Sequence, residues 1–414
     1  MSNDMSGTTI NKPIIARRWL PNEEAVLKRW HGIISEEIKK RHGAKRHLVI
    51  QEFEQLIDDD PVVRMYLTQM IKEIPEKYRD YHPKNLQDFL EQLNAVLTIA
   101  PPYIPPGHGE ATALVGTPFS AILIWTMGTP AGFAAYRNPK INAIFKKLLC
   151  VWAGFLNSEN SLYVLNDSPN GWMSVEAQNQ LNMQDYIYKP DAPHWGFTSW
   201  NDFFTREVRQ GARPVAGKHD DKVVVAACDS TVYRIGHNAQ ARSEFWIKSQ
   251  PYSLADMLNN EYVETFVGGD VWQAFLSPFR YHRWHSPVAG KIIKAYVKEG
   301  LYFSQATSEG EDPSDQDHSE GYITHVQTRA IFFIEADDKK IGMVCVMPVG
   351  MVEISSCIIH EKIKSGYHVE KGEELGYFQF GGSTHCLIFQ KDAIKDFKAT
   401  KGSVNFGQEI AIAN

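Results

Sequence analysis

The chain has 414 residues, which is too long for one ordinary hydrophobic core and predicts two domains. Hydrophobic residues make up 43% and charged residues 22%, as in globular proteins, and the formal net charge of -6 argues against a nucleic-acid-binding protein, since such proteins usually carry a basic excess. The five cysteines are widely spaced and include no C-x-x-C pair, so we expect reduced thiols in a cytoplasmic protein rather than disulfides or a zinc site.

The N-terminal part of the chain contains one segment that could be mistaken for a membrane span. Ala111 to Tyr136 carries no charged residue and is long enough to cross a bilayer. Glycines and prolines interrupt it, however, and its longest uninterrupted apolar run is only Ala121 to Trp125. The first residues, MSNDMSGTTINKP, have no apolar stretch and no basic start, so we expect no secretory signal. We therefore predict a buried core segment and no membrane partner.

Up to about residue 160, apolar residues recur at helical spacing. One helix is predicted to open at Pro61, with apolar positions Val62, Val63, Tyr66, Leu67, Met70 and Ile71. The clearest helix signal is Asn138-Pro139, a side-chain cap followed by a first-turn proline. The apolar face of that helix would comprise Ile141, Ile144, Phe145, Leu148, Leu149, Trp152, Phe155 and Leu156. We expect these helices to be structural.

The periodicity changes in the second half of the chain. Residues 158–200 are rich in turn-forming residues and are predicted to be irregular, and SWNDFFTREVRQGARPV is predicted to start as a short helix that ends at Gly211 and Pro214. The acidic segment 304–321 is predicted to be a surface loop, and a role as a lid stays open. Predicted strands cover Val223–Ala227, Thr231–Ile235, Ile292–Val297, Ala330–Ala336, Ile341–Met347 and Gly376–Phe380.

Helices followed by strands indicate an α+β fold. We expect a helical N-terminal domain over residues 1–165, an irregular linker over 166–195 and a β-rich domain over 196–414.

Three short motifs contain the parts of an activated nucleophile. Gly381 to Thr384 reads GGST, which alone would be an ordinary turn. YHRWHSP places His282 and His285 three residues apart, and Asp229 follows an apolar strand in CDS. Each residue also has a non-catalytic interpretation: the histidines could lie on the surface, and the aspartate could belong to a turn. A serine, a histidine and an aspartate together indicate nucleophilic catalysis.

The combination of FFTREVRQGARP, YHRWHSPVAGKI and FGGST resembles the phosphatidylserine decarboxylase family of pyruvoyl enzymes over roughly residues 196–414. In the N-terminal half, EQLIDDDPVV and GFAAYRNPKINAIFKKLLCVWAGFLNSENS, together with GMVEISSC, are similar to the soluble tryptophan decarboxylase branch of the fungal tryptamine and psilocybin pathway. That branch carries a helical N-terminal domain where lipid-acting members have a membrane anchor.

The resemblance implies that the chain cuts its own backbone between Gly382 and Ser383. Ser383 would attack the Gly382 carbonyl with His285 as base and Asp229 orienting the imidazole. Cleavage would leave a β chain to residue 382 and an α chain of residues 383–414 that stay together, with Ser383 converted into a covalent pyruvoyl group. This group would act as the electron sink in decarboxylation. His282 is the family-implied acid that returns a proton to the substrate.

The implied substrate is a small molecule, an aromatic L-amino acid, with L-tryptophan as the first candidate, giving tryptamine and CO2. One alternative is phosphatidylserine decarboxylation to phosphatidylethanolamine, which needs membrane access. Another is a non-enzymatic lipoyl- or biotinyl-like module, suggested by SGYHVEKGEELG, although such modules need a modifiable lysine at a hairpin tip. The side chains that would hold an indole stay open among Trp195, Trp200, Trp272, Trp284 and Tyr302.

Some residues depart from the family pattern or have no assigned role. Gly381 stands where leucine is common, and Ser230 where glycine is common. His385 replaces a usual apolar residue and could be a second acid/base or a surface residue. The sequence has no cluster of carboxylates that would predict a catalytic metal. His318 and His325 flank a polar loop and are expected to be solvated surface residues rather than ion ligands.

Overall fold

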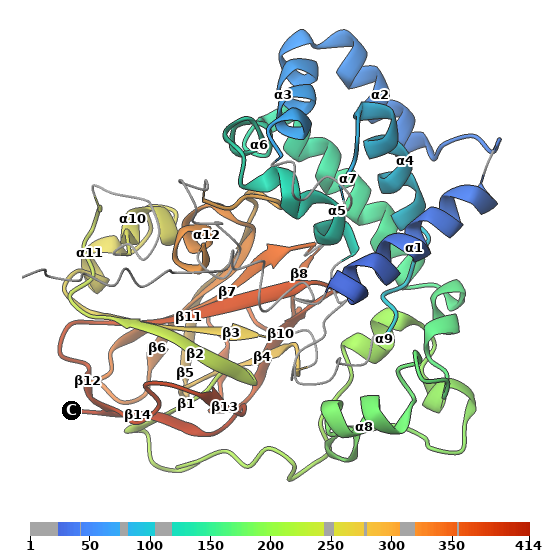
Figure 1. The fold of residues 1–414 in the computed structure, drawn as a ribbon. Helices are drawn as coiled ribbons and strands as arrows, with labels where there is room; N and C mark the ends of the chain where they lie inside the picture. The colour runs from blue at the N-terminus through green and yellow to red at the C-terminus, as the bar shows by residue number, and fades with distance from the viewer. Residues whose placement is uncertain are drawn as a thin grey trace, which may run out of the picture.

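A computed structural model of the chain describes residues 24–41, 43–74, 82–103, 118–243, 252–276, 280–306, 319–353 and 356–414. Helices form the N-terminal half, and antiparallel strands dominate the C-terminal half (Figure 1). The predicted α+β class is confirmed.

The helical half is built from amphipathic segments with local start signals. At the N-terminus of α7, the side chain of Asn138 accepts hydrogen bonds from the backbone N–H groups of Lys140 and Ile141, as its cap position predicts. The predicted apolar face of α7 is buried except for the half-buried Phe155. The helix predicted at Pro61 is α3, in which Val62 is exposed. The helices of this half are α1 (Glu24–Lys40), α2 (Leu48–Asp59), α3 (Pro61–Lys72), α4 (Leu86–Val96), α5 (Pro118–Met127), α6 (Pro130–Ala135) and α7 (Pro139–Leu156).

The uncharged segment that could resemble a membrane span folds into α5 and α6. Most of α5 is buried, as predicted, and residues 104–117 lie outside the described part of the chain. Within the described ranges, no helix combines the length and the apolar character that crossing a bilayer requires.

The connection between the halves contains more regular structure than its composition predicts. Ser174 caps α8 (Val175–Leu181) by accepting the N–H of Ala177, and 3₁₀ turns cover Glu159–Val164, Met183–Asp185 and Pro193–Gly196. The helix predicted to run to Gly211 is only α9 (Trp200–Phe204). The irregular segment expected over 158–200 is therefore wrong in part, because side-chain caps support short helices there.

The described residues of the β-rich half form one large antiparallel sheet and two small ones. In the large sheet the order is β13 (Ser403–Val404), β2 (Ser230–Gly236), β3 (Asp270–Leu276), β11 (Gly382–Phe389), β7 (Met343–Val352), β6 (Arg329–Ala336), β5 (Gly290–Lys298) and β9 (His368–Val369). One small sheet has the order β4 (Arg283–His285), β10 (Glu374–Phe378), β8 (Cys357–Ile359). The other has the order β1 (Val223–Val225), β14 (Glu409–Ala413), β12 (Ile394–Phe397).

Both faces of the large sheet are covered. One face shares a hydrophobic core with the small sheets, in which Trp272 and Leu387 pack with Trp284. The other face packs against α10 (Leu254–Met257) and α11 (Val263–Phe266), with α12 (Glu320–Val326) adjoining them. Because both faces are buried, the central strands are largely apolar on both sides and do not alternate regularly between apolar and polar residues.

The helical half and the β-rich half share one hydrophobic cluster. In α7, the side chain of Asn142 donates to the carbonyl of Gly300 (3.0 Å) and accepts from the N–H of Tyr302 (3.2 Å). The rings of Trp152 and Phe380 meet edge to face with centroids 4.7 Å apart. Phe380 directly precedes the GGST motif, so the helices contact the region that carries the predicted chemistry.

Candidate active site

The GGST motif lies at the start of a central strand rather than in a free turn. Gly381 is in the bend between β10 and β11 with φ +142°, a conformation that favours glycine. Ser383 pairs with Leu276 of β3 and with Gly350 of β7, whereas Gly382 pairs with Val352. The register with β7 therefore shifts between Gly382 and Ser383, at the peptide bond predicted to break. The β11–β7 pairing is therefore irregular at the bond whose carbonyl, that of Gly382, is predicted to be attacked.

The hydroxyl of Ser383 is buried and has no hydrogen-bond partner among the described residues. A buried hydroxyl without a partner costs free energy, and such groups in native proteins tend to mark functional positions. Gly381 and Gly382 have no side chains, so the residues that precede the Gly382 carbonyl do not shield it. These features fit a serine that acts on the adjacent peptide bond.

His285 is held in a defined orientation by both ring nitrogens. Nδ1 lies 2.9 Å from the carbonyl oxygen of Gly372 and must donate to it, so Nε2 carries the lone pair and accepts from the Tyr281 hydroxyl, also at 2.9 Å. The Phe406 ring stacks on the imidazole with centroids 3.6 Å apart. Burial lowers the pKa of His285 to about 4, so the ring is neutral and can accept a proton near neutral pH.

Asp229 is close to His285 but does not hydrogen-bond to it. Its carboxylate accepts from Nε and Nη2 of Arg213, at 3.1 and 2.8 Å, and from the backbone N–H of Phe406 at 2.7 Å. Arg213 also donates to Asp185 at 2.7 Å. Asp229 therefore reaches His285 through Phe406, whose N–H it binds and whose ring stacks on the imidazole. The direct Asp229–His285 contact implied by the family resemblance is absent between these residues.

His282 lies in an apolar environment. Its ring stacks on Phe204 with centroids 4.1 Å apart, and the carbonyl of Arg280 is close to it without reaching hydrogen-bond geometry. Burial, with the Arg206 guanidinium second, lowers the pKa of His282 to about 3. Phe204 also packs edge to face on Phe380, with centroids 5.1 Å apart, so this histidine lies beside the aromatic cluster that precedes GGST.

Two connections bring the histidine motif and GGST together. β3 ends at Leu276, which pairs with Ser383, and the chain then leads to the histidine motif. β4 carries His285 and pairs with β10, where His285 lies opposite Glu374, and β10 in turn leads into GGST. Ser383, His282, His285 and Asp229 thus come from one end of the β-rich half, and their catalytic roles stay predictions.

Two histidines predicted as possible surface residues are buried. His385 is on β11, two residues after Ser383 and on the same face, and its ring meets Trp272 edge to face at 5.4 Å. Nε2 of His325, in α12, accepts the backbone N–H of Ser253 at 3.0 Å. The surface interpretation of His385 and His325 is therefore wrong. The strands around His385 and the residues beside α10 around His325 bury both rings, although the neighbouring sequence is polar. His318 and most of the predicted acidic loop lie outside the described residues.

The residues missed by sequence reasoning are mainly partners of those predicted. They are Arg213, Phe406, Tyr281 and Phe204, of which Arg213, Phe204 and Tyr281 belong to the quoted motifs. Of the five candidate indole-binding residues, all are buried, and Trp200 packs on Phe380 with centroids 5.9 Å apart. All five cysteines are free. In the described part of the chain, no three His, Cys, Asp or Glu side chains gather as a metal site would require.

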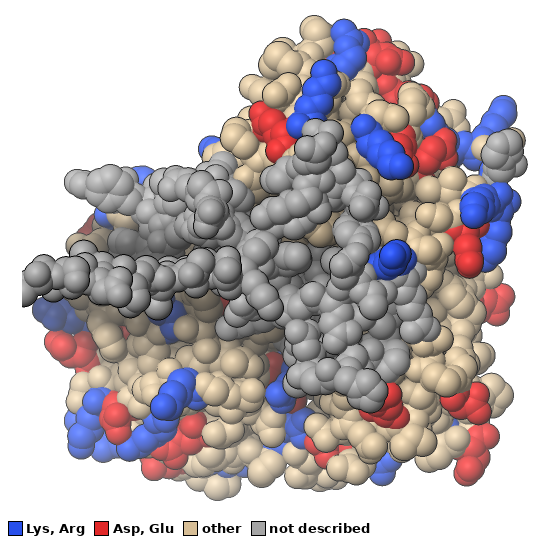
Figure 2. Space-filling view, in the orientation of Figure 1, with Lys and Arg blue, Asp and Glu red and all other residues tan. Residues whose placement is uncertain are grey.

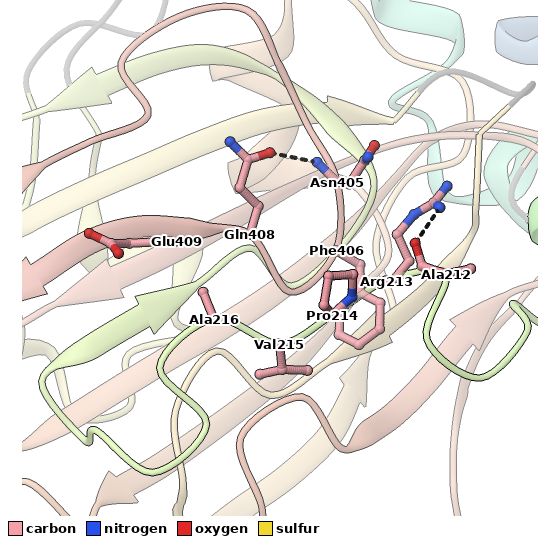
Figure 3. Close-up of a pocket in the computed structure, with 9 residues that line it drawn as sticks. All are labelled: Ala212, Arg213, Pro214, Val215, Ala216, Asn405, Phe406, Gln408 and Glu409. Carbon is pink, nitrogen blue, oxygen red and sulfur yellow. Dashed lines mark hydrogen bonds between the residues drawn. The ribbon is translucent and has the colours of Figure 1, made fainter.

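A cavity of about 480 Å³ is lined by residues 212–216 together with Asn405, Phe406, Gln408 and Glu409 (Figure 3). Arg213 and Phe406 line it, while Ser383 and the histidines do not. The Phe406 ring stacks on His285, so this cavity adjoins the support of the histidine rather than the reacting serine.

Comparison with known proteins gives consistent matches over both halves. The sequence profile described as phosphatidylserine decarboxylase matches residues 200–412, and a second profile with that description matches residues 47–181. An L-tryptophan decarboxylase of Psilocybe cubensis is 33% identical over 402 residues, covering 90% of this chain and 88% of that protein. Its counterpart in Psilocybe cyanescens is 33% identical over 403 residues, covering 91% and 88%. Decarboxylase iboD of Amanita muscaria is 37% identical over 303 residues, covering 68% and 86%.

Proposed function

The chain belongs to the phosphatidylserine decarboxylase family of carboxy-lyases, which use a pyruvoyl group, and from that premise we propose that it cleaves itself before Ser383 and decarboxylates an aromatic L-amino acid. L-Tryptophan, giving tryptamine and CO2, is the first candidate, because two relatives that this chain covers nearly end to end are named L-tryptophan decarboxylases. We place the catalytic domain at residues 196–414.

The observation that carries the proposal is the buried Ser383 hydroxyl, which has no hydrogen-bond partner among the residues that the structure describes and lies at the register shift between Gly382 and Ser383. In the first step the Ser383 oxygen attacks the Gly382 carbonyl carbon, and the peptide C–N bond breaks, which leaves an ester and a free Ser383 amine. His285 is the proposed base, since its ring is neutral near pH 7 and Nε2, which accepts from the Tyr281 hydroxyl in this structure, is the nitrogen that would take the proton.

In the second step a base removes the Cα proton of Ser383, the Cβ–O bond breaks, and Gly382 leaves as a carboxylate. The dehydroalanine that results at position 383 tautomerises to an imine, and one water molecule hydrolyses it to a ketone and ammonia. The buried serine beside two glycines fits such a group. The resulting ketone supplies the electrophile that binds the substrate amine and the sink that accepts the electrons released with CO2.

The side chains around this position have separate tasks. His282 lies in the apolar cluster beside Phe204 and is proposed to return a proton to the substrate carbon. Arg213 and Asp229 hold Phe406, which supports His285. The aromatic residues of the cluster exclude water, which protects a carbanion from uncontrolled protonation.

Strand pairing explains how the two products would stay associated. After a break before Ser383, residues 383–414 would retain β11 between β3 and β7, β14 beside β1 and β13 beside β2. The interactions are backbone ladders within buried sheets, so dissociation would require unfolding.

Phosphatidylserine remains the alternative substrate, and the family description favours it. A lipid substrate would need a surface that binds the bilayer. On the described part of the face in Figure 2, basic and acidic side chains are interspersed. A mixed surface gives weak attraction to anionic lipid.

The proposal is tested by the intact masses of purified protein. We expect two fragments that meet between Gly382 and Ser383, with the smaller one lacking the serine amine and shifted by a carbonyl-trapping reagent such as phenylhydrazine. Ser383→Ala should remain one chain. CO2 release should occur with tryptophan and be compared with phenylalanine, tyrosine and phosphatidylserine vesicles. An active preparation that keeps an unmodified Ser383 would overturn the mechanism, and turnover of the lipid alone would overturn the substrate.

A further inference from the structure

Glu353 is a buried acid immediately beside the proposed cleavage site. Val352 is the last residue of β7 and pairs with Gly382, so Glu353 follows the partner of the residue whose carbonyl is attacked. Its backbone has φ +57°, in the left-handed region that non-glycine residues rarely adopt. Its side chain is fully buried. A strained backbone carrying a buried acid requires a specific contact to hold it.

That contact is made with the helical half of the chain. A Glu353 carboxyl oxygen accepts a hydrogen bond from the backbone N–H of Ser120, a residue 233 positions away in the first turn of α5. The first N–H groups of a helix lack partners within the helix, and the first turn of α5 contains no acidic residue of its own. Glu353 therefore caps a helix of one half from the end of a strand of the other.

The contact lies where burial disfavours a charged carboxylate. Burial raises the pKa of Glu353 well above its ordinary value, and the α5 N–H groups only partly oppose that change. A protonated carboxyl can accept the Ser120 N–H through its carbonyl oxygen, and a glutamine side chain has the same shape and the same acceptor. This gives a variant that preserves the contact while it removes the acid.

The same helix also supports the other side of the cleavage site. Phe119 of α5 packs edge to face on Trp152 with centroids 5.2 Å apart, and Trp152 packs in the same way on Phe380 at 4.7 Å. Phe380 directly precedes Gly381. α5 is thus connected to the strand that contains the Gly382–Ser383 bond, through Phe380 before β11, and to one of its neighbours, through Glu353 after β7.

We propose that the helical half holds the Gly382–Ser383 bond in its reactive geometry, and that Glu353 is the positioning residue that transmits this through its hydrogen bond to α5. The inference rests on the proposed self-cleavage. It gives the helical half a role in maturation, since the shifted register at Gly382 persists only while β7 ends in the conformation that Glu353 fixes.

The test compares self-cleavage of pulse-labelled precursor made by cell-free translation. Glu353→Met keeps the size and removes the acceptor, and Glu353→Gly removes the acceptor while relieving the positive φ, so that one of the two is expected to fold. Both should cleave at least about tenfold more slowly than the unchanged chain, because misplacement of reacting groups strongly slows a reaction. Glu353→Gln should cleave within about threefold of the unchanged chain, since it retains the contact.

The matched control is Asn142→Ala, which removes the two hydrogen bonds from α7 to Gly300 and Tyr302 without touching the cleavage site. It loosens the same interface and should cleave at a near-normal rate at a temperature where it stays folded. Equal slowing in this control, or normal cleavage of folded Glu353→Met or Glu353→Gly, would overturn the proposal. Slowing in Glu353→Gln equal to that in Glu353→Met would assign proton transfer instead of positioning. An unchanged chain that never cleaves would mean that the proposed function itself is wrong.

Discussion

The hydroxyl of Tyr281 lies 2.9 Å from Nε2 of His285, the ring nitrogen that carries the lone pair. The proposed base therefore has its acceptor nitrogen occupied by a phenol, and Gly372 fixes the opposite nitrogen as a donor. A hydrogen bond donated to the neutral imidazole stabilises that form over the imidazolium. Tyr281 thus helps burial to keep His285 neutral.

This relationship predicts how the pH dependence of self-cleavage responds to Tyr281→Phe. With a pKa of about 4, His285 stays neutral between about pH 6 and pH 8, so the unchanged chain should cleave at a constant rate there and lose rate only at lower pH. Loss of the phenol should raise the pKa of His285 by roughly half a unit to one unit, since one net hydrogen bond is worth about 1 kcal/mol. The falling limb of the rate profile should move to higher pH by that amount.

The measurement is the single-turnover cleavage rate of precursor over a pH series, with circular dichroism to confirm folding. Tyr367→Phe is the matched control, because the Tyr367 hydroxyl binds the Glu373 carboxylate and no histidine. A profile of the unchanged chain that falls near pH 6.5 would show that the base titrates as an ordinary histidine and would contradict the assignment.

Buried histidines predict a loss of stability on mild acidification. Burial lowers the pKa of His285 and His325 to about 4 and of His282 and His385 to about 3, against 6.5 for an unperturbed ring. Below pH 6.5 the unfolded chain binds protons that the folded chain does not, so stability is complete above that pH and falls as the pH drops toward 4. Each ring contributes a slope of up to about 1.4 kcal/mol per pH unit.

Glu353 acts in the opposite direction, because its raised pKa makes the folded chain retain a proton above pH 4.5. Its contribution to stability is lost as the pH rises through that raised value, so its effect on the pH dependence of stability is opposite in sign to that of one buried histidine. Urea unfolding of Ser383→Ala, which stays one chain, should therefore give a free energy of unfolding that falls between pH 6.5 and pH 5. A free energy that stays level or rises over that interval would refute the burial of these rings.

The Arg213–Asp229 pair predicts a non-additive effect of substitution. Both side chains are almost inaccessible, with 7% and 1% exposed. Arg213→Ala leaves a buried carboxylate without its cation and should cost about 3 to 5 kcal/mol of stability. Adding Asp229→Asn removes that charge and keeps an acceptor for the Phe406 N–H, so the double variant should be more stable than Arg213→Ala alone.

The comparison is made by urea unfolding in the Ser383→Ala background. The control pair is Lys398–Asp396, in which both side chains are about half exposed, and its removal should change stability by less than about 1 kcal/mol. Strictly additive costs for Arg213→Ala and Asp229→Asn would mean that the pair is not coupled, which its hydrogen bonds contradict.

Helix starts and several strands, among them β2, β5 and β6, have local signals and were predicted from sequence, whereas β11 and the end of β7 were not. The start of α7 follows from Asn138 and Pro139, whose effect is confined to the first turn. β11 was missed because Gly381 and Gly382 resemble a turn, whereas the strand depends on partners on both sides, β3 and β7, which are distant in sequence. β7 likewise runs to Val352, past its predicted end at Met347.

For the site, the motifs identified residue types but not their contacts. Asp229 was expected to hold His285, yet its hydrogen bonds go to Arg213 and Phe406, which approach from different segments of the fold. His325 lies near a polar stretch, and only the packing of α12 beside Ser253 shows that it is buried. A side chain's partner is a property of tertiary structure, which one sequence without relatives does not contain.

His385 provides a test of which histidine serves Ser383. It is fully buried two residues from Ser383, and burial lowers its pKa to about 3. Among the residues that the structure describes, its ring nitrogens have no partner in hydrogen-bond geometry. A buried polar ring without partners lowers stability, so an apolar side chain of similar volume should be tolerated or should add about 1 to 2 kcal/mol. We therefore expect His385→Leu to unfold at equal or higher urea concentration.

His385→Leu should also cleave itself normally, because His285 is the proposed base and its contacts to Tyr281 and Gly372 do not involve position 385. His285→Leu provides the contrast and should remain uncleaved. The two variants remove the same ring from positions with similar burial, so a general loss of packing would affect both alike. If His385→Leu remains folded and uncleaved while His285→Leu is processed, the serine proton goes to the histidine on its own strand, and the Tyr281–His285 pair serves only to support the fold.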